Sequence, residues 1–156
     1  MRIVPILLAA ASLATVACVR TATNPVTGKT DVDIESPGKK GEDWTTTILG
    51  KGQYSAVRGS GKALVAEGKT TVTVSLEAAT AGAVYPWHVH EGTCASGGPI
   101  VGDAAAYTPL TVGNDGRAQG NAQLAVRLDE AHKYFINVHA SPSDMATTVA
   151  CGDLDD

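Results

Sequence analysis

The stretch Pro86-Trp87-His88-Val89-His90-Glu91-Gly92-Thr93-Cys94 decides how the rest of the chain is interpreted. Successive side chains of a β-strand point to opposite faces, so His88 and His90 share one face while Trp87 and Val89 share the other. Two imidazoles placed in this way favour the binding of one metal ion. A His-x-His pair alone is a weak signal, because four histidines in 156 residues can fall two apart by chance.

A second strand-like run, Tyr134-Phe135-Ile136-Asn137-Val138-His139, adds a third imidazole. Its alternate apolar residues share one face, and His139 lies on the other. If this strand lies beside the first, with Val89 and Val138 facing the core, the three histidines share the outer face. Three convergent neutral imidazoles suit copper or zinc.

The remainder of the chain favours short antiparallel strands. The segments 69–77 and 117–127 alternate between apolar and polar residues, as half-buried strands do. Turn signals separate the runs, among them Glu67-Gly68 and Asn114-Asp115-Gly116. We predict an all-β fold, a sandwich or barrel of eight strands. The expected strands lie near 52–58, 62–67, 69–77, 83–90, 107–112, 117–127, 133–139 and 147–154.

The N-terminal part is predicted to be a targeting segment followed by a tether. Residues 1–18 combine Arg2, a short apolar run and Cys18, which is typical of a signal peptide of the bacterial lipoprotein type, with Cys18 lipidated. The alternative is an ordinary secretory signal cut nearby. Residues 19–43 are rich in Thr, Pro, Gly, Asp and Lys and predict a flexible tether. Residues 44–156 then form one domain.

The cysteine count agrees with export. Three cysteines are an odd number for an exported chain. Lipidation of Cys18 leaves Cys94 and Cys151, one after each histidine strand, as a pair that suggests a bridge between the two regions. Disulfides persist outside the cytoplasm, so the expected location is the bacterial periplasm or cell envelope, with a lipid anchor in a membrane.

Several stretches together resemble the copper/zinc superoxide dismutase family over roughly residues 52 to 154. They are Trp87-His88-Val89-His90-Glu91-Gly92, Cys94 with Gly97-Gly98-Pro99, Val138-His139, and Ala150-Cys151-Gly152-Asp153-Leu154. The resemblance implies a Greek-key β-barrel. It also implies that His88, His90 and His139 are both the copper ligands and the catalytic group, at which superoxide is converted to oxygen and hydrogen peroxide.

The chain departs from the family pattern in three places. The histidine that the family shares between copper and zinc falls at Ile100, and the segment 99–115 contains no histidine and only Asp103 and Asp115 as carboxylates. The arginine that guides superoxide falls at Thr148. We therefore expect one copper per chain and no zinc, and the net charge of −4 gives no sign of electrostatic steering of an anion.

Three functions remain open at the level of sequence. The first is a copper-dependent superoxide dismutase, with superoxide as substrate. The second is a protein that buffers or delivers copper ions, for which Met145 offers a soft thioether to Cu(I). The third is a metal-free structural β-domain. Nucleic-acid binding is not expected, because the chain is acidic and has no basic patch. The oligomeric state stays open.

Overall fold

The computed structural model describes residues 19–23, 30–34 and 42–156 of the chain. Two compact units are present, residues 1–39 and residues 40–156. The predicted targeting segment, residues 1–18, and its Cys18 lie outside the described residues. The second unit is built from strands, with only two single turns of 3-10 helix, η1 (Gly52–Tyr54) and η2 (Ala104–Ala106), among its described residues. The prediction of an all-β fold is confirmed.

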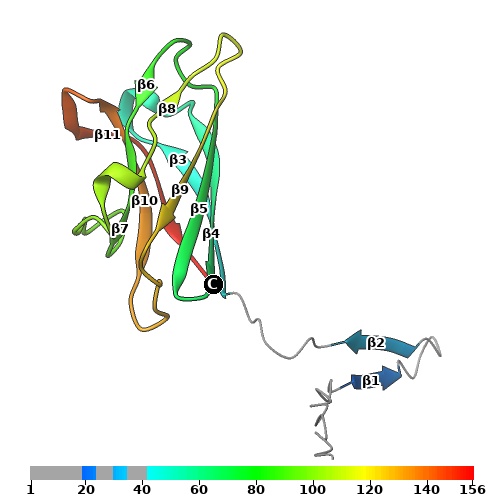
Figure 1. Cartoon of the computed structure of the whole chain (residues 1–156). Helices are drawn as coiled ribbons and strands as arrows, with labels where there is room; N and C mark the ends of the chain where they lie inside the picture. The colour runs from blue at the N-terminus through cyan, green and yellow to red at the C-terminus, as the bar shows by residue number, and fades with distance from the viewer. Residues whose placement is uncertain (1–18, 24–29, 35–41) are drawn as a thin grey trace, which may run out of the picture. The chain divides into compact units, whose positions relative to one another are not determined.

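Seven strands form one antiparallel sheet in the order β7-β10-β11-β3-β4-β5-β9, and β6 pairs with β8 in a separate two-stranded sheet. The large sheet curls into a half-barrel (Figure 1). The first strand of this unit, β3, lies beside the last, β11. The bounds are β3 (Glu42–Gly50), β4 (Arg58–Ala66), β5 (Lys69–Glu77), β6 (Val84–Tyr85), β7 (Trp87–Glu91), β8 (Leu110–Thr111), β9 (Ala118–Leu124), β10 (Tyr134–Ser141) and β11 (Asp144–Leu154).

The hairpin of β4 and β5 follows directly from its sequence. Val72, Val74 and Leu76 are buried, whereas the residues between them point outward. Glu67 and Gly68 form the two-residue connection, and both have positive φ, 53° and 76°. A two-residue hairpin loop with two left-handed residues matches the twist of the strands that it joins. The expected strand over 69–77 is confirmed at both ends.

A core of aliphatic and aromatic side chains fills the interior of the half-barrel. The largest fully buried side chains come from β3, β5, β7, β8, β9, β10 and β11 and from the loop after β9, so both halves of the curled sheet contribute to one core. Burial of such side chains stabilises each by about 1.5–3 kcal/mol relative to exposure. They include Ile48, Val72, Leu76, Trp87, Val89, Leu110, Leu124, Leu128, Ile136, Val138 and Val149.

The predicted strand near 52–58 is wrong. That region begins with η1, and the strand lies earlier, as β3 (Glu42–Gly50). Trp44 and Ile48 are its buried residues, and Thr46 occupies the inward position between them. The run of threonines at positions 45–47 hides the alternation of apolar and polar residues, so the sequence pattern does not indicate this strand.

Two short strands lie within the segment expected to be a tether, β1 (Val19–Thr23) and β2 (Thr30–Ile34), and they pair as an antiparallel hairpin. Among the described residues, no helix is long and apolar enough to cross a membrane.

Candidate metal centre

The histidine group is built by β7 and β10, which are neighbours in the sheet. His88 and His90 both come from β7, where they lie opposite Asn137 and Phe135 of β10. His139 follows Val138, the last residue of β10 that is paired with β7, and its backbone N–H donates to the carbonyl oxygen of Pro86 at 2.8 Å. The end of one strand is thereby tied to the start of the other, which brings all three imidazoles together.

The imidazoles of His88, His90 and His139 converge at one point. One nitrogen of each ring lies within 4.8 Å of the corresponding nitrogens of the other two. Nδ1 of His88 lies 3.3 Å from Nε2 of His139. The group can therefore hold a metal ion, as the phase of the two strands predicted. Among the described residues it is the sole group of at least three His, Cys, Asp or Glu side chains with this convergence.

The group is buried rather than lying on an open face. His88, His90 and His139 have 6%, 9% and 5% of their surface exposed. After β7 the chain turns back and pairs with the edge of that strand, next to the group. Glu91 N–H donates to the carbonyl of Pro99 at 3.0 Å, and Val101 N–H donates to the carbonyl of Val89 at 2.9 Å.

Hydrogen bonds leave one ring nitrogen of His90 free for a ligand. Nδ1 of His90 lies 2.9 Å from the carbonyl oxygen of Gly98, and this contact requires Nδ1 to carry the proton. Nε2 then has an unshared lone pair, yet it is buried without a partner among the described residues. Leaving a buried acceptor unpaired costs about 1–3 kcal/mol. A metal ion at this nitrogen would satisfy it.

The electrostatics keep the three rings neutral. Burial, reinforced by the nearby His139 and His90, lowers the pKa of His88 to about 4. Burial also lowers the pKa values of His90 and His139, although the backbone carbonyl of Gly98 opposes the shift at His90. A neutral imidazole is the form that binds metal. At neutral pH the site is therefore ready to accept a cation without first losing protons.

The disulfide that the sequence suggested is confirmed. Cys94 and Cys151 are bonded, with an S–S distance of 1.97 Å. The backbone N–H of Cys94 also donates to Oδ1 of Asp153 at 2.6 Å. Both contacts fasten the loop after β7 to β11, and the same loop carries Gly98, whose carbonyl orients His90.

Two aromatic rings border the histidines, and sequence reasoning missed both. Phe135 stacks on His90 with a centroid distance of 5.0 Å and an angle of 19° between the planes. Tyr107 meets His88 edge-on at 5.1 Å and 81°. Phe135 was open to prediction, because it alternates in phase with His139 along β10. Tyr107 lies beyond an irregular loop, so no periodic pattern signals its position.

The other candidate residues lie around the group or away from it. Ile100 forms a β-bridge with His90 and is 39% exposed. Thr148 is the register partner of His139. Met145 is 39% exposed near the start of β11, and no described contact joins its sulfur to the histidines. His132 is half-exposed, 3.9 Å from Glu91, and lies outside the group as expected.

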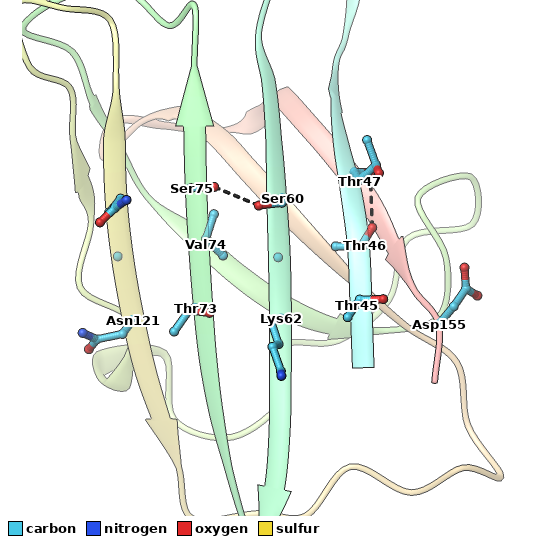
Figure 2. A pocket seen from close by; sticks show the side chains of 13 residues that line it. Thr45, Thr46, Thr47, Ser60, Lys62, Thr73, Val74, Ser75, Asn121 and Asp155 are labelled. Carbon is cyan, nitrogen blue, oxygen red and sulfur yellow. Dashed lines mark hydrogen bonds between the residues drawn. The ribbon is translucent and has the colours of Figure 1, made fainter. Parts of the chain in front are cut away.

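A separate hollow of about 770 Å³ lies on the outer face of β3, β4, β5 and β9 (Figure 2). Its side chains are mostly hydroxyls and amides, such as Thr45, Ser60, Thr73 and Asn121. Its one cation, Lys62, is paired with Asp43 at 2.9 Å. The hollow has no histidine in its lining, so the metal-binding chemistry belongs to the opposite half of the sheet.

Comparison with protein-family models and with curated proteins found no match for this chain.

Proposed function

We propose that this chain is a copper-binding protein of the copper/zinc superoxide dismutase family that dismutates superoxide at a three-histidine site. The observation that carries the proposal is the convergence of His88, His90 and His139 within 4.8 Å, at the positions that match the copper histidines of the family. The curled antiparallel sheet, with β3 beside β11, supports assignment to the Greek-key barrel of that family.

The donor set favours copper over the hard cations. The group offers imidazole nitrogens and no carboxylate or thiolate. Imidazole suits copper and zinc, whereas magnesium and calcium prefer oxygen ligands. We favour copper over zinc, because Ile100 occupies the position of the histidine that the similar family shares between copper and zinc. Bound copper would supply one-electron exchange with superoxide.

The protein residues would perform three tasks around that ion. His88, His90 and His139 would hold it through neutral nitrogens, which their lowered pKa values favour. Gly98 would orient His90 by accepting a hydrogen bond from Nδ1. Phe135 and Tyr107 would exclude water from two sides of the group.

Copper buffering or delivery is the second candidate function. The segment between Glu91 and Asn114 contains no Lys or Arg to attract an anion. Ile100 and Met145 are instead exposed apolar side chains near His90 and near the start of β11. A copper carrier needs no attraction for superoxide, so these features are the reason to keep this second function.

We further propose export to the cell envelope, with a lipid anchor at Cys18. The disulfide between Cys94 and Cys151 supports an oxidising compartment. The anchor is proposed from the sequence of residues 1–18 alone.

Copper titration of the purified chain with its disulfide formed tests the function. Uptake of one copper per chain, lost in His88→Ala and kept in His132→Ala, would support the site. A superoxide assay on the loaded protein would then separate the two functions. Fast turnover identifies a dismutase, and tight Cu(I) binding without turnover identifies a carrier. Absence of stoichiometric copper would refute both and favour the metal-free structural domain.

A further inference from the structure

The three histidines of the group are held in different ways. His90 is anchored by the contact of its Nδ1 with the carbonyl oxygen of Gly98. His139 is fixed at its backbone by the hydrogen bond to Pro86. The ring of His88 has no such anchor: within the described part of the chain, its one hydrogen-bond contact is with His139 itself. Packing must therefore set the orientation of His88.

The orientation of His88 matters because its two ring edges differ. Nδ1 faces Nε2 of His139 at 3.3 Å. A rotation of the ring by 180° about Cβ–Cγ would exchange Nδ1 with a carbon and remove a donor from the point of convergence. Besides the rings of His90 and His139, the ring that contacts His88 is that of Tyr107, which is 5% exposed and meets the imidazole edge-on at 5.1 Å. Rings in this edge-to-face geometry attract each other, because the positive edge of one meets the negative face of the other.

Tyr107 is itself held by contacts of its hydroxyl group and of its ring. Its hydroxyl donates to the carbonyl oxygen of Val101 at 2.7 Å. The N–H of Val101 in turn donates to the carbonyl of Val89 in β7, the residue after His88. The tyrosine ring also packs edge-on against Trp87 at 5.2 Å. Val101 thus connects β7 to the hydroxyl of Tyr107, and the ring of Tyr107 contacts His88 on the same strand.

We infer that Tyr107 is a positioning residue for the metal site: it holds the imidazole of His88 so that Nδ1, and not Nε2, faces the point where the three rings converge. His88 would then help to hold the ion through the nitrogen that already faces His139. This inference rests on the proposed metal-binding function. It adds a residue that does not touch the ion yet determines how one ligand is presented to it.

The test compares Tyr107→Met, which keeps most of the volume but removes the ring, with Tyr107→Phe, which keeps the ring. Both are loaded with Cu(II), and the dissociation constant and the electron paramagnetic resonance spectrum are measured. Tyr107→Met should bind copper about 10- to 100-fold more weakly, with an altered spectrum. Tyr107→Phe should stay within about threefold of the wild type and keep its spectrum, because the edge-to-face contact survives.

A matched control removes a buried tyrosine elsewhere. Tyr134 packs on Trp44 at 5.5 Å, so Tyr134→Met should lower stability yet leave the copper spectrum unchanged. If Tyr107→Met kept the copper affinity and the spectrum of the wild type, the inference would be wrong and the proposed function would still stand. A wild-type chain that takes up no copper would overturn the proposed function and the inference with it.

Should Tyr107→Met not fold, Tyr107→Leu supplies a second variant without the ring. Nitrogen-15 magnetic resonance of the Cu(I)-loaded wild type and variant reports the coordination of His88 in each. A changed signal of His88 in the variant is expected, and an identical signal would overturn the inference.

Discussion

Nδ1 of His88 lies 3.3 Å from Nε2 of His139, although 51 residues separate them in the chain. Two ring nitrogens at this distance in a buried place are either hydrogen bonded to each other or arranged to share a cation. In the first case only one of the pair carries a proton. In the second case both lone pairs point at the ion, and the third donor, Nε2 of His90, is already free for it.

Replacing a histidine of the group should abolish stoichiometric metal binding. In His139→Ala two donors remain, and the copper affinity should fall by more than the roughly 10- to 100-fold that follows loss of an outer contact to a ligand. Calorimetric titration of wild type and variant with copper measures the change. His132→Ala is the matched control, because this histidine is half-exposed and lies outside the group. Equal affinities in His139→Ala and wild type would contradict the three-histidine site.

The metal-free protein should lose stability on acidification. The unfolded chain protonates its histidines near pH 6.5, whereas burial lowers the pKa of folded His88 to about 4. Between these two values the unfolded state binds more protons, so the free energy of unfolding decreases as the pH falls and levels off below about 4. For His88 alone the loss is at most about 3 kcal/mol. Urea denaturation from pH 7 to pH 4 measures it.

The comparison for this pH effect is His88→Asn, which cannot take up the proton. Its stability should depend less steeply on pH over the same interval. An identical slope in the variant and the wild type would show that other groups cause the acid sensitivity.

The histidine site was open to prediction from sequence because each of its parts is local. The alternation within β7 fixes His88 and His90 on one side, and the phase of β10 fixes His139. The residues that surround the site are harder to predict from the sequence. Tyr107 reaches His88 only through an irregular loop held by Val101, and no period in the sequence encodes that path.

The strand β3 shows a different limit of the sequence pattern. Threonine occurs on both the buried and the exposed face of a strand, because its side chain has both a methyl and a hydroxyl group. Thr46 therefore occupies an inward position between Trp44 and Ile48 without marking it as apolar. The strand became evident only from its pairing with β4 and β11.

Gly98→Ala should weaken metal binding through His90. A Cβ atom at this position would overlap the carbonyl oxygen of Glu91, so the loop would have to shift. The shift would move the carbonyl of Gly98 away from Nδ1 of His90 and release the ring. We expect about 10-fold weaker copper binding, measured by competition with a chelator. Ala95→Ser, at an exposed position of the same loop, should bind as the wild type does.

Reduction of the disulfide should lower the free energy of unfolding by about 4 kcal/mol, the value expected in the chain-entropy model for a loop closed over 57 residues. Guanidinium denaturation of the oxidised and reduced chains measures the difference. Copper affinity should fall as well, because the same loop positions Gly98 beside His90. The double variant Cys94→Ser with Cys151→Ser should reproduce both effects, and undiminished stability would contradict this role.

Thr148→Arg should accelerate the reaction of the copper-loaded protein with superoxide. Thr148 is the register partner of His139, so a guanidinium there would place a positive charge beside the site. Charge near a site raises the association rate of an anion by about 10-fold or more at low ionic strength, and salt screens the effect. The matched control is Thr71→Arg, which makes the same charge change at an exposed position on β5. Pulse radiolysis at two salt concentrations measures both variants. If Thr148→Arg gains no more than Thr71→Arg, attraction of superoxide does not limit the reaction, and copper buffering or delivery becomes the better assignment.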